Sequence, residues 1–198
     1  MDKYIAKLSK RDMPPLDALK KELKRERYKR RFRRLLRSTI NALIVVAAIA
    51  ALVATLVLPV LQIAGTSMEP SLNDGDIVLL VKTDNLHSGD LCAFYFSNKI
   101  LIKRIIAIPG DYIWIESDGT VFLNGEALDE PYVSEKALGE CDVEFPYQVP
   151  ENNYFVMGDK RESSIDSRSS VIGCIAEDQM VGKIICKIWP FSEFEFMN

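Results

Sequence analysis

Three segments of the chain contain the side chains best suited to chemistry. GTSMEPSL (65–72) contains Ser67, ILIKRIIAI (100–108) contains Lys103, and GDKRESSIDSR (158–168) is rich in hydroxyl and charged side chains. A serine hydroxyl is a weak nucleophile and needs a base beside it. These residue types therefore raise the hypothesis of hydrolysis by a serine that a lysine activates.

Other kinds of active site are disfavoured by what the sequence lacks. His87 is the only histidine, and it lies in the polar stretch NLHSGD, which is typical of a solvated loop. A Ser-His-Asp triad would have to use it, and a zinc site built on several histidines is excluded. Glu69 stands where a GxSxG elbow needs glycine, and no phosphate-binding glycine motif occurs. We expect neither a metal nor a cofactor.

Lys103 is the candidate base because of its place in an apolar strand. With a period of two, Lys103 shares a face with Leu101, Ile105 and Ala107, whereas Arg104 shares the other face with isoleucines. Burial favours the neutral amine of a lysine, whereas arginine stays protonated. The alternative is that Lys103 extends from a sheet edge into solvent, and this strand alone does not decide between the two. The 158–168 segment could add a hydroxyl that orients the lysine and an Asp166–Arg168 pair that braces the loop.

The elements around these segments predict a mainly β fold. Short β-branched runs alternate with turns, and no long helix follows residue 61. Residues 112–153 are rich in acids, glycine and proline, and we expect a small inserted β subdomain there. The expected strands are 76–81, 91–96, 100–108, 112–115, 121–123, 154–157 and 180–188, with tight turns at Asp118-Gly119 and Asn124-Gly125.

An uncharged run of 22 residues, Ile40–Leu61, precedes this domain. It is long enough to cross a hydrocarbon core of ~30 Å, so we expect one uncleaved transmembrane helix at 38–61 rather than a core helix or a signal peptide. The arm at 1–37 is expected to be partly helical and cytoplasmic, and the domain at 62–198 extracytoplasmic. The helical stretch Leu16–Arg37 either lies along anionic headgroups or acts only as a topology signal.

Charge sets the expected orientation. Residues 1–37 carry fifteen Lys/Arg and five Asp/Glu, a net +10, while the rest of the chain is −13. No basic residue occurs in the twenty positions after Leu61. The positive-inside rule therefore places the N-terminus in the cytoplasm. Because an apolar span follows the basic arm, we interpret the arm as a membrane feature and expect no nucleic-acid partner.

Four cysteines lie at positions 92, 141, 174 and 186, without a CxxC or zinc spacing. Outside the cytoplasm they could pair in three ways, or they could remain thiols, and the sequence leaves both alternatives open. It likewise leaves the oligomeric state open, with a monomer as our expectation.

The ordered set of motifs resembles bacterial type I signal peptidase. GTSMEPSL, GDIVLL (75–80), KRIIAIPGD (103–111), GDKRESSIDSR and VGKIICKIWPF (181–191) follow one apolar span, and the resemblance covers about residues 40–191. It implies a signal-peptidase-like antiparallel β domain. It also implies a serine endopeptidase that removes signal peptides from exported preproteins after small-x-small sites.

Carried over position by position, the resemblance implies a role for each site residue. Ser67 is the implied nucleophile, with its backbone N–H in the oxyanion hole, and Lys103 is the implied general base. Ser164 would hydrogen-bond the lysine, and Asp166 and Arg168 would support it. The implied substrate pockets are lined by Ile63, Met68, Leu72, Leu101 and Ile102.

The chain departs from the family pattern at two positions. Gly65 replaces a residue that supplies a hydroxyl to the oxyanion hole in some members. Lys160 stands where the usual pattern has Asn, so it changes the charge beside the site but replaces no assigned catalytic group.

Two other functions remain alternatives. One is a dedicated processing peptidase for a conjugation or surface-fibre system. The other is a non-catalytic assembly factor with the same fold, which loss of Ser67 or Lys103 would mark, and both residues are present. A self-cleaving repressor is disfavoured by the apolar span and the absence of a DNA-binding segment.

Overall fold

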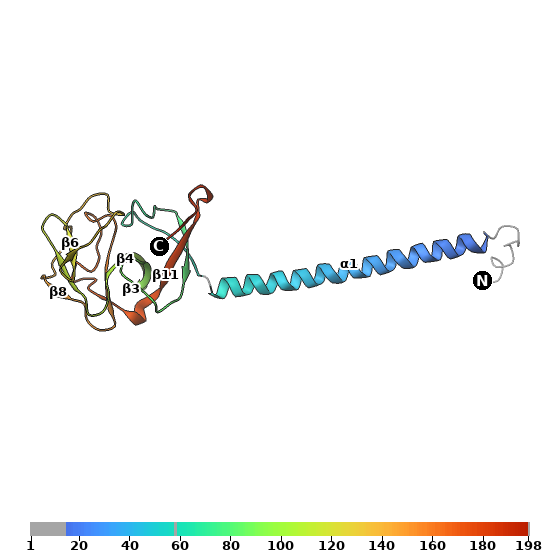
Figure 1. Cartoon of the computed structure of the whole chain (residues 1–198), viewed down its shortest axis with the longest axis horizontal. Coiled ribbons are helices and arrows are strands. Elements are labelled where there is room, and N and C mark those ends of the chain that lie inside the picture. The colour runs from blue at the N-terminus through green and yellow to red at the C-terminus, as the bar shows by residue number, and fades with distance from the viewer. Residues whose placement is uncertain (1–14, 58, 198) are drawn as a thin grey trace. The chain divides into compact units, whose positions relative to one another are not determined.

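The computed structural model describes residues 15–57 and 59–197, with side chains described for 15–52 and 59–197. Two compact units divide the chain near residue 54. The first contains most of a long helix, and the second contains all the strands (Figure 1).

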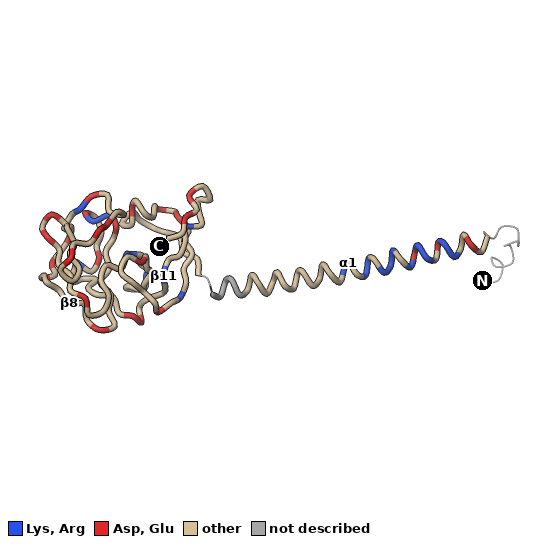
Figure 2. The backbone as a smooth tube through the Cα atoms, viewed as in Figure 1, with Lys and Arg blue, Asp and Glu red and all other residues tan. Residues whose placement is uncertain are grey.

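Among the described residues, the first unit contains the greater part of helix α1, Leu16–Val57, which is 42 residues long. Lys and Arg side chains are concentrated in its first half, and Figure 2 shows the uncharged stretch that follows them. An 18-residue window of this helix has a mean hydropathy of 2.0, and no part of that window is buried. By length and composition α1 is therefore able to cross a membrane.

The basic arm and the apolar run form one continuous helix rather than two segments. The helix ends at Val57, short of the predicted end at 61, and residues 60–62 form a strand instead. Pro59 accounts for this difference, because proline disfavours helical geometry in the residue before it. The part of the predicted arm before residue 15 lies outside the described residues.

The second unit is built on an eight-stranded antiparallel sheet (Figure 1). Its strand order is β1-β2-β11-β3-β4-β9-β10, and β12 pairs with β11. Among the described residues, the only helical segments after α1 are two three-residue 3-10 turns, η2 (Glu177–Gln179) and η3 (Phe191–Glu193). The sheet comprises β1 Val60–Gln62, β2 Ile77–Val81, β3 Leu91–Phe96, β4 Lys99–Ala107, β9 Asn153–Met157, β10 Ile175–Ala176, β11 Met180–Trp189 and β12 Glu195–Phe196.

A smaller four-stranded sheet lies within the segment predicted as an insertion. Its order is β7-β6-β5-β8, with the strands β5 Tyr112–Ile115, β6 Val121–Leu123, β7 Glu126–Ala127 and β8 Tyr147–Gln148. The strands predicted at 112–115 and 121–123 are confirmed, and they form a hairpin in which β5 pairs antiparallel with β6. Asn124 and Gly125 both have positive φ, as the predicted tight turn requires.

The two sheets share one apolar core. Ile106 and Phe155, from the large sheet, pack in the same buried cluster as Ile113 and Val121, from the small sheet. Since buried apolar area is the main stabilising term in folding, this shared cluster fixes the insertion against the large sheet. The small sheet is therefore part of the same compact unit as the large one.

Strand β4 separates two other apolar clusters. Ile100 and Ile102 contact the cluster under β1 and β2, whereas Leu101 and Ile105 belong to the opposite cluster. The predicted alternation therefore holds up to Ile105. It fails at Ala107, which joins Ile106 in the core shared with the small sheet, because a register shift lies between Ile105 and Ala107.

Candidate active site

Ser67 lies in the loop that connects β1 to β2, and its side chain is half-buried. The base of this loop is closed by two backbone hydrogen bonds, from Ile63 N to Asp76 O at 2.8 Å and from Gly75 N to Ile63 O at 3.0 Å. Gly65 N donates to Asp74 Oδ1 at 2.7 Å. These hydrogen bonds therefore fix the backbone conformation of the loop, although most residues from 64 to 74 are exposed.

Gly65 has a φ of +104°, a conformation that residues with side chains rarely adopt. A serine or threonine at this position would be strained in the present backbone. The glycine at position 65, which departs from the pattern described above, is thus matched to the backbone conformation of this loop. The backbone N–H of Ser67 donates to no protein acceptor within the described chain, so it is free to face a substrate oxygen.

Lys103 lies on β4 and is 5% exposed. Its Nζ donates a hydrogen bond to Ser164 Oγ at 2.8 Å. Burial lowers the pKa of Lys103, and the charge of Arg168 lowers it further, while Asp166 and Asp159 partly oppose this shift. The environment therefore favours the neutral amine that a general base requires.

Ser67 and Lys103 line the same small cavity of about 130 Å³. No hydrogen bond joins Ser67 Oγ to Lys103 Nζ within the described residues, although such contacts are often long in an enzyme without substrate. The cavity also exposes apolar side chains close to the two polar groups. Its full lining is Leu61, Gln62, Ile63, Ala64, Gly65, Ser67, Met68, Ile100, Leu101, Ile102 and Lys103.

Four of the five residues predicted to form substrate pockets line this cavity: Ile63, Met68, Leu101 and Ile102. Leu72 does not. It has no exposed surface and packs in the buried cluster that also contains Met68. A side chain without accessible area supports the pocket from beneath and does not contact a ligand directly.

The predicted Asp166–Arg168 pair forms, and it is fully buried. Arg168 donates from Nε to Asp166 Oδ1 and from Nη2 to Asp166 Oδ2, both at 2.8 Å, which is the bidentate geometry that suits a carboxylate. Burial alone would raise the pKa of Asp166, but hydrogen bonds and the charge of Arg168 bring it below its usual value. Asp166 also accepts from Gly158 N at 2.9 Å.

Gly158 has no room for a side chain. A Cβ atom there would lie 2.2 Å from Ser164 Oγ and 2.6 Å from the carbonyl oxygen of Ser67. The 158–168 loop therefore packs directly against the loop that carries Ser67, and only glycine permits this approach.

Two further buried ion pairs brace this region, and the sequence did not reveal them. Arg104 donates to Asp159 at 2.9 Å and 2.6 Å, and its guanidinium lies 3.8 Å from the centre of the Tyr132 ring. Arg161 pairs with Glu130, which comes from the inserted segment. Arg104 had been recognised as a charge on an apolar strand, so a buried partner could have been anticipated, but its identity depends on the tertiary fold.

His87 and the four cysteines do not form a comparable arrangement within the described residues. The side chain of His87 is 62% exposed, and it does not line the Ser67 cavity. The four cysteines are free thiols, and burial raises the pKa of Cys92 to about 12, so that thiol is inert. Within the described part of the chain, no group of three or more His, Cys, Asp or Glu is placed to hold a metal ion.

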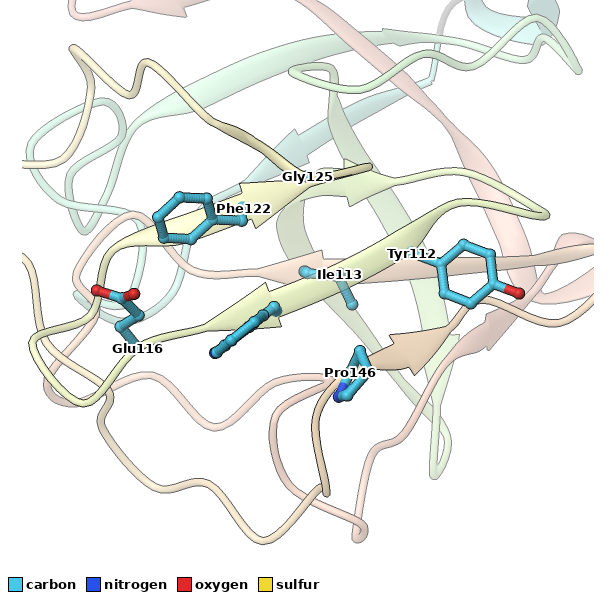
Figure 3. A pocket seen from close by; sticks show the side chains of 7 residues that line it. Tyr112, Ile113, Glu116, Phe122, Gly125 and Pro146 are labelled. Carbon is cyan, nitrogen blue, oxygen red and sulfur yellow. The ribbon is translucent and has the colours of Figure 1, made fainter.

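A second, larger cavity of about 270 Å³ lies on the small sheet (Figure 3). It shares no residue with the Ser67 cavity, and no serine, lysine or histidine lines it. Tyr112, Phe122, Glu116 and Pro146 surround it (Figure 3). Of these two cavities, the smaller one, between β1 and β4, is therefore the candidate active site.

Comparison with known families agrees with this site. A family model described as "Signal peptidase, peptidase S26" matches residues 36–189. This chain belongs to the signal peptidase family. The match begins within α1 and includes the whole described site, from Ser67 to Arg168.

Two relatives support the same assignment by their sequences. Signal peptidase IB of Staphylococcus aureus is 38% identical over 154 residues, which are 68% of this chain and 79% of that protein. Signal peptidase I of Bacillus licheniformis is 36% identical over 144 residues, 66% of this chain and 76% of that protein. A crystal structure of a signal peptidase I from Enterococcus faecalis aligns with 50% of this chain and 97% of that one, at 26% identity and a TM-score of 0.43.

Proposed function

We propose that this chain is a membrane-anchored serine endopeptidase that removes signal peptides from exported preproteins, with Ser67 as nucleophile and Lys103 as general base. The observation that carries the proposal is a buried lysine with a lowered pKa that lines one cavity with a half-buried serine. A neutral amine can accept the serine proton, which an ordinary exposed lysine cannot do at neutral pH.

The chemistry proceeds in two steps. Ser67 Oγ attacks the scissile carbonyl carbon while its proton passes to Lys103 Nζ, and the resulting oxyanion accepts a hydrogen bond from Ser67 N–H. The C–N bond then breaks, and the proton on Nζ goes to the departing amine. Water, deprotonated by Lys103, next attacks the acyl ester and releases Ser67 and the cleaved signal peptide.

Ser164, Asp166 and Arg168 act as supports in this scheme. Ser164 Oγ accepts a hydrogen bond from Lys103 Nζ and so fixes the direction of its lone pair. Asp166 and Arg168 hold the turn that carries Ser164. Since neither side chain lines the cavity, their contribution is to the position of the base.

Two unpaired strand edges line the cavity and suit an extended peptide. β1 is the terminal strand of its sheet and pairs only with β2. On β4, residues 100–103 pair with β3 on one side, while β9 pairs only from Arg104 onward. A substrate chain can therefore add as a strand, and the shallow apolar cavity between these edges favours small side chains near the cleaved bond.

The charge of α1 supports the orientation of the anchor. Eight basic residues from Arg25 to Arg37 precede the apolar stretch, and none occurs in the twenty residues after Leu61. We infer that the N-terminus is cytoplasmic and that the second unit lies outside. Proteolysis of right-side-out and inverted membrane vesicles tests this, because the second unit should be degraded only in the right-side-out preparation.

Cleavage by the detergent-solubilised chain tests the catalytic assignment. Ser67→Ala, Lys103→Ala and Lys103→Arg should each abolish cleavage of a precursor with an Ala-x-Ala site, since arginine cannot give up its proton. Lys82→Ala and Lys82→Arg, at an exposed lysine outside the cavity, are the matched controls and should retain full activity. Normal turnover by Lys103→Arg would overturn the proposal, and a panel of precursors separates a general from a dedicated peptidase.

A further inference from the structure

Lys160 contacts the nucleophile loop twice, once through its backbone and once through its side chain. Its backbone N–H donates to the carbonyl oxygen of Ser67 at 3.1 Å. Its Nζ donates to Glu69 Oε2 at 2.8 Å. Glu69 lies two residues after Ser67, so these two contacts hold the loop on both sides of Met68.

The same residue is connected to the base. Ser164 N donates to the carbonyl oxygen of Lys160 at 3.2 Å, and Ser164 Oγ accepts from Lys103 Nζ at 2.8 Å. A continuous run of hydrogen bonds therefore leads from the peptide of Ser67, through Lys160 and Ser164, to Lys103. The relative position of nucleophile and base depends on how firmly Lys160 holds its neighbours.

The Lys160–Glu69 pair is the one ion pair, among the described residues, that joins the 64–74 loop to the 158–168 loop. Its side chains are 45% and 33% exposed, in contrast to the fully buried pairs Arg161–Glu130 and Arg168–Asp166. An exposed pair contributes little to global stability and is screened by salt. Its effect should therefore be local, on the loop that it holds.

We propose that Lys160 and Glu69 form an ionic clamp that positions Ser67 relative to Lys103 and thereby sets the rate of turnover. The inference rests on the proposed function, and it concerns positioning residues, since neither side chain lines the cavity or contacts the reacting atoms. Small displacements of a nucleophile from its productive geometry reduce the rate of the chemical step, which is how the clamp acts.

Neutral substitutions and a charge swap test the clamp in the detergent-solubilised full chain. Glu69→Gln and Lys160→Gln keep the backbone hydrogen bond to Ser67 and should lower kcat by about two- to fivefold with KM unchanged. The double variant Glu69→Lys with Lys160→Glu should recover most of the lost rate. High salt should slow the native enzyme toward the rate of Glu69→Gln and leave that variant's rate unchanged.

A pH profile separates positioning from direct electrostatics. The charges that act on the pKa of Lys103 are Asp166, Arg168 and Asp159, and Lys160 is not among them. The midpoint of the kcat–pH curve should therefore be the same in Lys160→Gln and in the native chain. A shifted midpoint would mean that Lys160 acts on the base by its charge, and this would overturn the clamp.

Matched controls and the catalytic variants keep the outcomes distinct. Glu162→Gln removes a negative charge, as Glu69→Gln does, but from an exposed, unpaired position of the described 158–168 loop. Lys82→Gln removes a positive charge, as Lys160→Gln does, from an exposed lysine, and both control variants should retain the native rate. Equal rates for Glu69→Gln and Glu162→Gln, or a rise in KM at constant kcat, would refute the clamp. Loss of the proposed function would instead appear as native chain that cleaves no better than Ser67→Ala.

Discussion

The 158–168 loop and the small sheet place charged side chains in opposite ways. In the loop, Arg161, Asp166 and Arg168 have almost no exposed surface, and each has an ionic partner. In residues 111–151, eleven Asp/Glu accompany a single lysine, and most of these carboxylates are exposed. A buried charge is tolerated only with a partner, so a buried ion pair fixes the positions of the segments that carry it. An exposed charge imposes no such constraint, and apolar packing then holds the backbone.

This difference in how charges are buried explains why the Ser67 cavity, and not the cavity on the small sheet, is suited to catalysis. A lysine loses its proton only where water is scarce and the neighbouring dipoles are fixed, and the paired arginines around Ser164 provide such a place. The cavity on the small sheet has exposed aromatic rings, with Tyr112 at 52% and Trp114 at 53%, and a solvated carboxylate from Glu116. The side chains of Tyr112 and Glu116 are exposed there, whereas Lys103 is buried.

The largest expected effect comes from breaking a buried pair in the loop. Asp166→Asn leaves Arg168 without its counter-ion and should lower the free energy of unfolding by about 3–5 kcal/mol. Asp142→Asn, at an exposed carboxylate that is bonded to Ser170, should leave it nearly unchanged. Thermal unfolding in detergent measures both variants, and equal losses would contradict the contrast between buried and exposed charges.

Glu130 sharpens the comparison because it belongs to the acidic segment but is buried against the loop, where it pairs with Arg161. Glu130→Gln should destabilise the fold by about 3 kcal/mol, since it leaves the arginine charge uncompensated. Glu135→Gln, at an exposed acid of the same segment, is the control and should stay within about 0.5 kcal/mol of the native chain. The same unfolding assay shows whether burial or position within the acidic segment determines the loss of stability.

The lowered pKa of Lys103 predicts a dependence of stability on pH. The unfolded lysine binds a proton that the folded one has released, so between the folded pKa and the ordinary value of about 10.4 stability rises with pH, by up to about 1.4 kcal/mol per unit. Turnover should also rise as pH increases through the folded pKa. Lys103→Met should lack this slope, so the difference in unfolding free energy between native chain and variant should itself vary with pH. A difference that does not vary with pH would assign the slope to another group.

The smallest effect is expected on the small sheet. Trp114 contacts Phe122 at 6.4 Å between ring centres, so Trp114→Ala should cost about 0.5–1.5 kcal/mol of stability. The rate of precursor cleavage should not change, because Trp114 does not line the Ser67 cavity. A loss of kcat in a fully folded Trp114→Ala variant would show that the two regions are coupled during catalysis.

Local patterns were sufficient for the longer strands, whereas the short strands β1, β7, β8, β10 and β12 were not predicted. The β-branched run at 100–108 placed Lys103 among apolar neighbours, and the structure gives β4 at Lys99–Ala107. The Asn124-Gly125 turn likewise follows from residue type alone. The membership of the family and the order of its motifs added roles for Ser164, Asp166 and Arg168, which remain proposals to be tested.

Features that depend on contacts between distant segments were not predicted. The register shift after Ile105 moves Ala107 to the other face, and nothing in the alternation of the strand signals it. The partners of Arg104 and Arg161 lie 55 and 31 residues away along the chain, so only the folded arrangement identifies them. Leu72 was assigned to the pocket from its motif, but a motif does not tell a lining side chain from one buried beneath it.

The free edges of β1 and β4 set a requirement on the shape of whatever is cut. An α-helix uses its own amides and carbonyls internally and has none to offer to a neighbouring strand. A precursor whose cleavage region is helical must therefore unwind before it can engage both edges. Residues that break helices just ahead of the scissile bond should therefore make a precursor a better substrate.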